Sequence, residues 1–251
     1  MSLKFLEKLL ILFISGSYLF AGEITVSAAA SLKNAMEEIK KTYEEEFKGS
    51  KITLNLGASG ALQQQIENGA PVDIFISAAS KQMNDLNKKG YIMGGTEFYL
   101  LKNDVVLIIP KKSKVQINNL NNLLNESIKS IGIGEPNSVP VGQYAMEIFN
   151  KLDLLKSIEK KFIYGKDVKA VLSWVETGNV DAGIVYKTDA ILSNKVVIVD
   201  GAPKGSHSEV IYPCAVIKDT KKIAESKRFL TYLKGEKSRE IFTKYGFTSF
   251  L

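Results

Sequence analysis

Two serines stand where predicted strands pass directly into predicted helices. Ser31 follows residues 26–30, which are small or apolar, and Ser59 lies in the tetrapeptide Gly57-Ala58-Ser59-Gly60. The start of a helix leaves backbone N–H groups without an acceptor, and a serine hydroxyl adds one more donor beside them. Glycine also allows a sharp turn and the close approach of a ligand. Residues of these types in this order could bind an anion without a countercharge.

The second half of the chain offers two further helix starts. Pro140 suits the first position of a helix, which would leave the amides of Val141 and Gly142 free to donate. Asp167 is of the type that caps helices, which would place the amide of Val168 at the next helix start. Both stretches follow predicted strands, and open α/β sheets bind ligands at the carboxyl ends of their strands.

Tyr186 completes the set, because it ends a predicted strand and presents a phenol. Taken singly, each of these motifs is more often structural, since a serine before a helix is usually a cap and a glycine-rich tetrapeptide is usually a turn. Their joint occurrence at strand ends, in both halves of the chain, favours a binding role. These motifs predict an anion site at Ser31, Ser59, Val141 with Gly142, Val168 and Tyr186.

Size and composition limit the other functions open to this chain. Its 251 residues are enough for one large or two modest globular domains. The net charge is +6, but the lysines are scattered and no arginine cluster accompanies them, so we expect no nucleic-acid partner. Cys214 is the only cysteine, which excludes an intramolecular disulfide and a zinc site made of cysteines.

The N-terminus has the layout of a secretory signal peptide. Two lysines precede an apolar run, residues 9–20, which is too short to span a bilayer comfortably. We expect cleavage after Ala21, which makes residues 1–21 the signal peptide; an uncleaved membrane anchor is the alternative. No cysteine lies near the cleavage site, so no lipoprotein anchor is expected. The mature protein should therefore be soluble outside the inner membrane.

The rest of the chain alternates strand and helix patterns, which predicts an α/β fold of mainly parallel sheets covered by helices on both faces. Alternating or apolar runs predict strands at residues 23–28, 51–56, 73–77, 105–110, 131–134, 161–164, 181–186, 195–199 and 212–217. Amphipathic patterns predict helices at residues 32–47, 61–68, 141–152, 168–177, 188–192 and 224–245.

Two of these strands, residues 105–110 and 212–217, lack a tight β–α motif, and we expect the chain to cross between two domains there. The first domain, lobe 1, would comprise residues 22–103 and 213–251, and the second, lobe 2, residues 104–212. Both serines of the predicted site then belong to lobe 1, and its other residues belong to lobe 2. This division predicts a cleft that closes over the anion by a hinge motion.

The combined motifs resemble the periplasmic molybdate-binding proteins of bacterial ABC importers. The resemblance covers nearly all of the chain after residue 21. The stretches that carry it are Ala28-Ala29-Ala30-Ser31-Leu32, Gly57-Ala58-Ser59-Gly60-Ala61-Leu62, residues 65–78, Val139-Pro140-Val141-Gly142-Gln143-Tyr144-Ala145, Gly183-Ile184-Val185-Tyr186 and Tyr245-Gly246-Phe247. It implies a two-lobed type II periplasmic-binding-protein fold, in which two sheets are joined by two crossing strands.

The resemblance also implies the function and the site. Molybdate or tungstate would be held by the hydroxyls and amides of Ser31 and Ser59, the amides of Val141 and Val168, and the hydroxyl of Tyr186. Relatives often carry alanine at the position of Val141, but an amide donor survives that change. The implied partners are an ABC permease and its ATPase at the inner membrane. We expect a periplasmic monomer that uses no cofactor and catalyses no reaction.

Three alternatives remain to be weighed against this interpretation. A serine hydrolase would need a base, and the only histidine, His207, lies in a polar loop without a Gly-x-Ser-x-Gly motif. A protein of the same fold could bind sulfate or another oxyanion, whereas an organic anion would need an arginine clamp, and Arg228 and Arg239 both lie in the C-terminal helical region. The ligand-sensing domain of a transcription regulator is opposed by the signal peptide.

Overall fold

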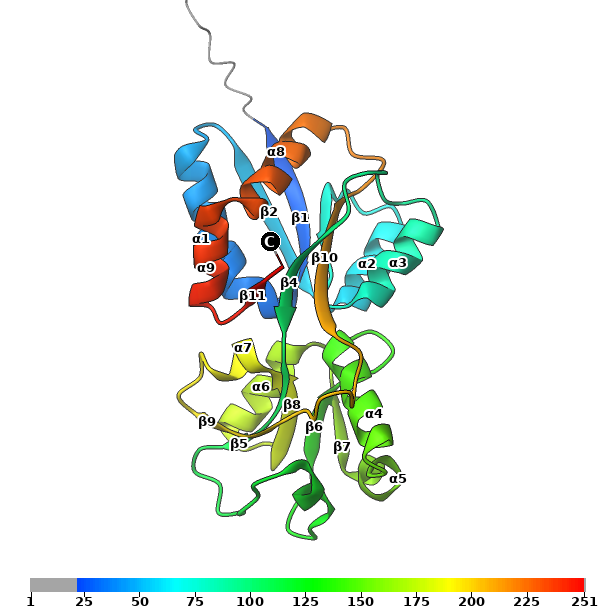
Figure 1. Cartoon of the computed structure of the whole chain (residues 1–251), viewed down its shortest axis with the longest axis vertical. Coiled ribbons are helices and arrows are strands. Elements are labelled where there is room, and N and C mark those ends of the chain that lie inside the picture. The colour runs from blue at the N-terminus through cyan, green and yellow to red at the C-terminus, as the bar shows by residue number, and fades with distance from the viewer. Residues whose placement is uncertain (1–21, 251) are drawn as a thin grey trace, which may run out of the picture.

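The computed structural model describes residues 22–250, which form two α/β lobes stacked along the long axis of the molecule (Figure 1). The predicted signal peptide, residues 1–21, lies outside the described residues. Within residues 22–250, no helix is both long enough and apolar enough to cross a membrane.

Lobe 1 contains a six-stranded sheet with the order β11-β4-β10-β3-β1-β2. Its strands are β1 (Glu23–Ala29), β2 (Lys51–Gly57), β3 (Ile74–Ile76), β4 (Phe98–Asn103), β10 (Val210–Val216) and β11 (Thr248–Ser249). Its helices are the 3₁₀ turn η1 (Ala30–Leu32), α1 (Lys33–Glu46), α2 (Ser59–Glu67), α3 (Ser80–Lys88), α8 (Ile223–Lys234) and α9 (Glu236–Lys244).

Helices cover both faces of this sheet because its central strands are apolar on both sides. Phe75 of β3 packs in the core beneath α2 and α3, whereas its neighbours Ile74 and Ile76 belong to the core that contains α1 and α8. Figure 1 shows α2 and α3 on one side of the sheet and α1 and α9 on the other. A strand buried on both faces is typical of doubly covered α/β sheets.

Lobe 2 contains a five-stranded sheet with the order β7-β6-β8-β5-β9. Its strands are β5 (Val105–Pro110), β6 (Ile131–Gly134), β7 (Phe162–Gly165), β8 (Ala182–Tyr186) and β9 (Val196–Gly201). Its helices are η2 (Leu120–Leu124), α4 (Pro140–Lys151), α5 (Leu155–Ile158), η3 (Glu159–Lys161), α6 (Val168–Thr177) and α7 (Lys187–Ala190).

The chain passes between the lobes at two places. Asp104 alone separates β4 in the first sheet from β5 in the second, and residues 202–209 lead back from β9 to β10 (Figure 1). Residues 210–212, expected at the end of lobe 2, pair instead with β4 in the sheet of lobe 1. The pairing keeps β10 as one continuous strand of lobe 1.

The sheets are mixed rather than mainly parallel. Only β1, β2 and β3 in lobe 1, and β6, β7 and β8 in lobe 2, pair in parallel. Strands β4, β5 and β10 lie next to the interlobe connections and pair antiparallel with every neighbour. The predicted β–α alternation is correct for the parallel segments, and it fails where the chain leaves one lobe for the other.

The C-terminal helix predicted at residues 224–245 is two helices. Gly235 lies between α8 and α9 with φ −70° and ψ 162°, an extended conformation that ends the first helix. Its N–H donates to the Tyr232 carbonyl at 3.0 Å, and the hydroxyl of Ser238 donates to the same carbonyl at 2.8 Å. These bonds satisfy one of the carbonyls left free at the helix end.

Candidate anion-binding site

All five predicted binding residues line one small cavity between the lobes. Ser31 follows β1 and Ser59 follows β2, so lobe 1 contributes the two serines. Val141 lies in the first turn of α4, Val168 begins α6, and Tyr186 ends β8, so lobe 2 contributes the rest. Each residue therefore lies beyond or at the carboxyl end of a strand, where the sequence pattern predicts it.

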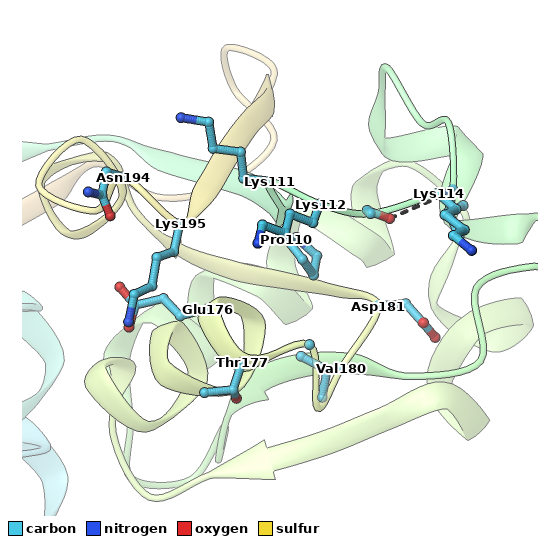
Figure 2. A pocket seen from close by; sticks show the side chains of 13 residues that line it. Pro110, Lys111, Lys112, Lys114, Glu176, Thr177, Val180, Asp181, Asn194 and Lys195 are labelled. Carbon is cyan, nitrogen blue, oxygen red and sulfur yellow. Dashed lines mark hydrogen bonds between the residues drawn. The ribbon is translucent and has the colours of Figure 1, made fainter.

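The cavity is too small for most organic ligands. Even with the space at its mouth included, its volume is about 210 Å³, below the roughly 300–1,000 Å³ of typical organic ligand pockets. A wider hollow lies on lobe 2 between residues 110–115 and 176–181, and its volume, measured in the same way, is about 1160 Å³. Figure 2 shows Lys111 and Lys114 of that hollow pointing away from each other. These two charges do not converge on a common point, so the small cavity is the better candidate.

The lobes touch across the mouth of the small cavity. The Gly60 N–H in α2 donates to the Ser138 carbonyl of lobe 2 at 2.9 Å. A β-carbon built on Gly60 would lie 2.6 Å from that carbonyl oxygen, so the contact requires glycine. The structure therefore represents a closed arrangement of the two lobes.

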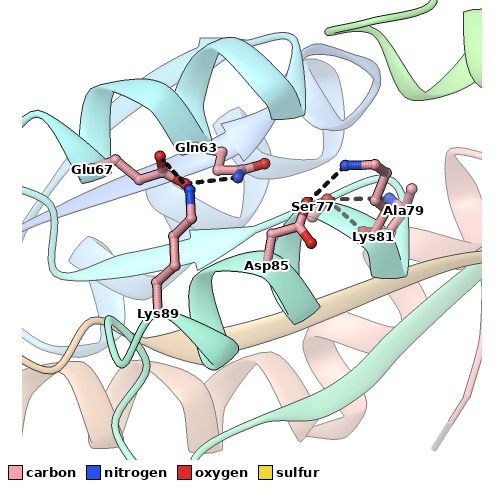
Figure 3. Close-up of polar contacts among 7 residues, drawn as sticks. All are labelled: Gln63, Glu67, Ser77, Ala79, Lys81, Asp85 and Lys89. Atoms are coloured by element: carbon pink, nitrogen blue, oxygen red, sulfur yellow. Dashed lines mark hydrogen bonds and ion pairs between the residues drawn. The ribbon is translucent and has the colours of Figure 1, made fainter.

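Ser59 is placed as a donor to the cavity rather than as a helix cap. It is the first residue of α2, and no side chain caps that helix. Its Oγ accepts the N–H of Ala78 at 3.0 Å. The Ser77 hydroxyl fixes the loop around Ala78, because it donates to the Ala79 carbonyl at 2.7 Å and accepts the Ala79 N–H at 3.2 Å (Figure 3). With its oxygen so engaged, the Ser59 hydroxyl has a proton left to donate.

Ser31 has a comparable arrangement with a different partner. It lies in the turn η1 between β1 and α1, and no side chain caps either helical segment. Its Oγ lies 2.9 Å from the Tyr212 hydroxyl, and both side chains are buried. Neither serine thus performs the capping role that is common for serine before a helix.

The second lobe presents backbone donors at the starts of α4 and α6. Among the hydrogen bonds of the described residues, none uses the N–H of Val141 or Val168. Asp167 is the predicted N-cap of α6, and its carboxylate accepts the Ala170 N–H at 2.8 Å. That bond leaves the Val168 amide free for a ligand.

The prediction for Gly142 is wrong. Its N–H donates to the Val139 carbonyl at 2.9 Å and is not free. The residue has a packing role instead, because a β-carbon there would lie 2.1 Å from the carbonyl oxygen of Gly134 in β6. Glycine allows α4 to lie directly against the sheet, and this contact sets the position of Val141.

Tyr186 reaches from lobe 2 toward lobe 1. Its hydroxyl lies 3.5 Å from the Ala78 carbonyl oxygen, a long contact that leaves the proton weakly engaged. Burial raises the pKa of Tyr186 well above its ordinary value. The phenol therefore stays neutral and remains a donor throughout the physiological pH range.

The cavity has donors but little formal charge. Among its described lining residues, Asp167 is the one charged side chain, and it is engaged in capping α6. Within residues 22–250, no three His, Cys, Asp or Glu side chains are grouped to hold a metal ion. What remains is a set of hydroxyls and amide N–H groups at helix starts, the arrangement that suits an oxyanion.

The sequence does not predict an ion pair between a partly exposed lysine and a buried aspartate of lobe 2. Lys169 of α6 and Asp189 of α7 follow the ligand positions Val168 and Tyr186 closely, and Lys169 Nζ lies 2.5 Å from Asp189 Oδ1. Neither Asp189 oxygen receives a hydrogen bond of good geometry. Burial raises the pKa of Asp189 to about 6, although Lys169 opposes the shift. The separation of 20 positions in sequence gives no local signal of this pair.

His207 does not line the cavity. Its Nδ1 lies 2.6 Å from the Ser208 carbonyl oxygen, in an exposed loop. Among the described contacts it pairs with neither Ser31 nor Ser59. The geometry that a histidine base would need beside a serine nucleophile is not formed there.

Comparison with known proteins identifies the family. The family model for bacterial extracellular solute-binding proteins matches residues 24–248. YvgL of Bacillus subtilis, whose name describes it provisionally as an ABC transporter substrate-binding lipoprotein, is 46% identical over 90% of this chain and 86% of its own length. The molybdate-binding protein ModA of Escherichia coli is 40% identical over 90% and 89% of the two chains.

A solved structure supports the same assignment. It is a substrate-binding domain from Clostridium difficile, attributed provisionally to a molybdenum ABC transporter. It is 42% identical to this chain, with a TM-score of 0.69 over 90% of this chain and 98% of its own. With a family model that spans nearly all the described residues and relatives above 40% identity, this chain belongs to the family of bacterial extracellular solute-binding proteins.

Proposed function

We propose that this protein is the solute-binding component of an ABC importer and that it captures molybdate in the interlobe cavity. The proposal is supported above all by the convergence of the two serines and three lobe 2 residues on one small cavity. It is supported also by the names of the relatives at 40–42% identity, which refer to molybdate or molybdenum.

The proposed ligand is a tetrahedral dianion that loses its water when the cleft closes. Burying such a charge costs many kcal/mol unless each oxygen receives donors. Hydroxyls and amides supply them here, and each helix start adds the equivalent of about half a positive charge. Ser31, Ser59, Val141 and Val168 each lie within the first two residues of a helical segment. Several such ends directed at one point offset much of the dianion's charge.

This donor set also selects among oxyanions. Hydrogen phosphate carries a proton and needs an acceptor, which none of the five residues supplies with its ligand-facing group. Sulfate has no proton and is excluded by size, because donors set for longer metal–oxygen bonds leave it with unmade hydrogen bonds at about 1–3 kcal/mol each. Tungstate is nearly the size of molybdate, so we expect it to bind as well.

The remaining parts of the proposal concern the transport cycle. The lobes open and close about the two connections between the sheets, and the bound anion stabilises the closed form. A membrane permease with its ATPase recognises that form and receives the ligand. The protein is exported by residues 1–21 and acts as a periplasmic monomer, without a cofactor and without catalysis.

A thermal-shift panel tests the proposal. The protein without residues 1–21 is heated with molybdate, tungstate, sulfate or phosphate, each over a range of concentrations. Molybdate and tungstate at a hundred times their dissociation constants should add about 2.7 kcal/mol of stability, whereas phosphate should add none. Stabilisation by sulfate alone would assign the site to that oxyanion, and no stabilisation by any of the four would reject the proposed function.

A further inference from the structure

A buried chain of hydrogen bonds lies behind Ser31. The Ser31 Oγ is 2.9 Å from the Tyr212 hydroxyl, and Asn103 Nδ2 donates to that same hydroxyl oxygen at 3.1 Å. Tyr212 belongs to β10 and Asn103 ends β4, so both lie where the chain passes between the lobes. Neither is one of the predicted ligand residues.

The orientation of the Asn103 amide is fixed by its neighbours. Its Oδ1 accepts the backbone N–H of Asp104 at 2.9 Å, which only an oxygen can do. Its Nδ2 therefore faces the other way, and it donates to the Thr188 Oγ1 at 2.9 Å as well as to Tyr212. The tyrosine oxygen is consequently an acceptor in its bond with Asn103.

This orientation decides where the Tyr212 proton goes. The phenol is fully buried, and burial raises its pKa, so the hydroxyl keeps its proton. Its described hydrogen-bond partners are Asn103, which donates, and Ser31. The Tyr212 proton must then be donated to Ser31 Oγ, and the Ser31 proton is left for a group in the cavity.

The Ser59 hydroxyl is also left as a donor to the cavity, but through a bond with the backbone. Its oxygen accepts a backbone N–H, that of Ala78, which no side-chain substitution removes. The direction of the Ser31 hydroxyl depends on the side chains of Tyr212 and Asn103. Of the two serines, Ser31 is therefore the one whose hydroxyl direction is set by the side chain of another residue.

We propose that Tyr212 is a specificity-determining positioning residue, which keeps the Ser31 hydroxyl as a donor and so excludes oxyanions that carry a proton. This inference rests on the proposed function. When the Ser31 oxygen accepts the Tyr212 proton, the Ser31 proton cannot turn back toward Tyr212 and is left for the cavity, so the P–OH group of hydrogen phosphate meets a donor there. Without that bond, the Ser31 hydroxyl is free to rotate and to accept the proton of hydrogen phosphate or hydrogen arsenate.

The experiment compares two dianions of equal charge, molybdate and hydrogen phosphate, at about pH 8. Binding of each is measured by calorimetry for the wild type and for Tyr212→Phe. The variant should bind molybdate several-fold more weakly and hydrogen phosphate more tightly. The ratio of molybdate affinity to hydrogen phosphate affinity should therefore fall at least tenfold. In a Ser31→Ala background, Tyr212→Phe should change the ratio by less than twofold, because its effect passes through that serine.

Two further variants separate an effect on the direction of the Ser31 hydroxyl from an effect on the packing of a buried tyrosine. Asn103→Asp replaces the donor to Tyr212 with an acceptor, which should reverse the direction of the hydrogen bonds from residue 103 through Tyr212 to Ser31. The ratio of molybdate affinity to hydrogen phosphate affinity should then fall, as it does in Tyr212→Phe. Tyr232→Phe is the matched control, since Tyr232 is also buried and its hydroxyl makes the same kind of bond, to Thr42 Oγ1 at 2.9 Å, but in the contact between α8 and α1. It should leave the ratio unchanged.

The outcomes distinguish this inference from the proposed function. If the wild type binds neither molybdate nor tungstate, the proposed function fails. If the wild type binds molybdate and both Tyr212→Phe and Asn103→Asp keep the ratio within twofold, Tyr212 has no role in specificity. Should Tyr212→Phe fail to fold, Asn103→Asp alone decides, because Asn103 is only partly buried and keeps its shape.

Discussion

The Gly60 N–H donates to the Ser138 carbonyl across the mouth of the cavity, at 2.9 Å. Gly60 belongs to α2 of lobe 1 and Ser138 to the loop before α4 of lobe 2, so the bond exists only while the lobes are closed. The interatomic space leaves no room for a side chain at residue 60. The closed form thus depends on the absence of a side chain at Gly60, a residue whose N–H bonds to Ser138 and not to the ligand.

Substitution of Gly60 tests this role in closure. Gly60→Ala should weaken molybdate binding about tenfold or more, roughly 1.4 kcal/mol, because the added methyl group meets the Ser138 backbone in the closed form. The melting temperature of the ligand-free variant should not fall, since an open form does not bring these atoms together. Gly94→Ala is the control, because a β-carbon there meets nothing within 4 Å. Equal affinities for both variants and the wild type would contradict the closure mechanism.

The serine hydroxyls can be tested directly. Ser31→Ala and Ser59→Ala should each weaken molybdate binding tenfold or more, because each removes a donor from a buried anion. Ser59→Ala should also lower the stability of the ligand-free protein by about 1–3 kcal/mol, since the buried Ala78 N–H loses its acceptor. Calorimetry and chemical denaturation measure the two effects separately.

The control for the serines is Lys111→Ala. Lys111 lies in the wide hollow on lobe 2 and does not line the cavity. It should not alter affinity, even though it removes a positive charge from a protein that binds an anion. If all three variants bound molybdate like the wild type, the assignment of the site would have to be abandoned.

Asp189 gives the protein a specific pH dependence of stability. Burial raises its pKa in the folded state from 3.8 to about 6, so the folded state binds the proton more tightly than the unfolded state. Its contribution to stability is therefore present at low pH and is lost as the pH rises from about 4 to about 6, by about 3 kcal/mol in total. Asp189→Asn removes this titration and should gain stability relative to the wild type over that interval.

Denaturation at about pH 3, pH 4 and pH 7 measures the difference, because Asp85 titrates below its unfolded pKa of 3.8 and Asp189 titrates above that value. Asp85→Asn is the control, because its effect on stability should change with pH in the opposite direction. A hydrogen bond from Lys81 lowers the pKa of Asp85 in the folded state, so the ionised carboxylate stabilises the fold at pH values above the pKa of the unfolded state. Relative to the wild type, Asp85→Asn should lose stability as the pH rises, whereas Asp189→Asn gains it. The same trend in both variants would show that Asp189 does not titrate as described.

The sequence was sufficient to predict the parts of the site that depend on local pattern. Residues 105–110, 131–134 and 168–177 have the predicted boundaries, because proline, glycine and capping signals mark their ends. The five donors lie together because each follows or ends a strand, and the topology of α/β sheets brings strand ends to one edge.

Contacts distant in sequence could not be predicted in this way. Tyr212 lies 181 positions from Ser31 and reads as an ordinary core residue of an apolar strand. Strand β4 (Phe98–Asn103) was not predicted, because its polar last residues, Lys102 and Asn103, resemble a loop until β10 and β11 pair with them. The free amide predicted for Gly142 fails for a local reason instead, since the first turn of α4 bonds back to Val139.

The most direct test of the central claim is diffraction from crystals grown with molybdate, at a wavelength where molybdenum scatters anomalously. If the site is assigned correctly, one strong anomalous peak should lie within hydrogen-bond reach of the Ser31, Ser59 and Tyr186 hydroxyls and of the amides of Val141 and Val168. A cavity without such a peak, or a peak bound elsewhere on the protein, would contradict it.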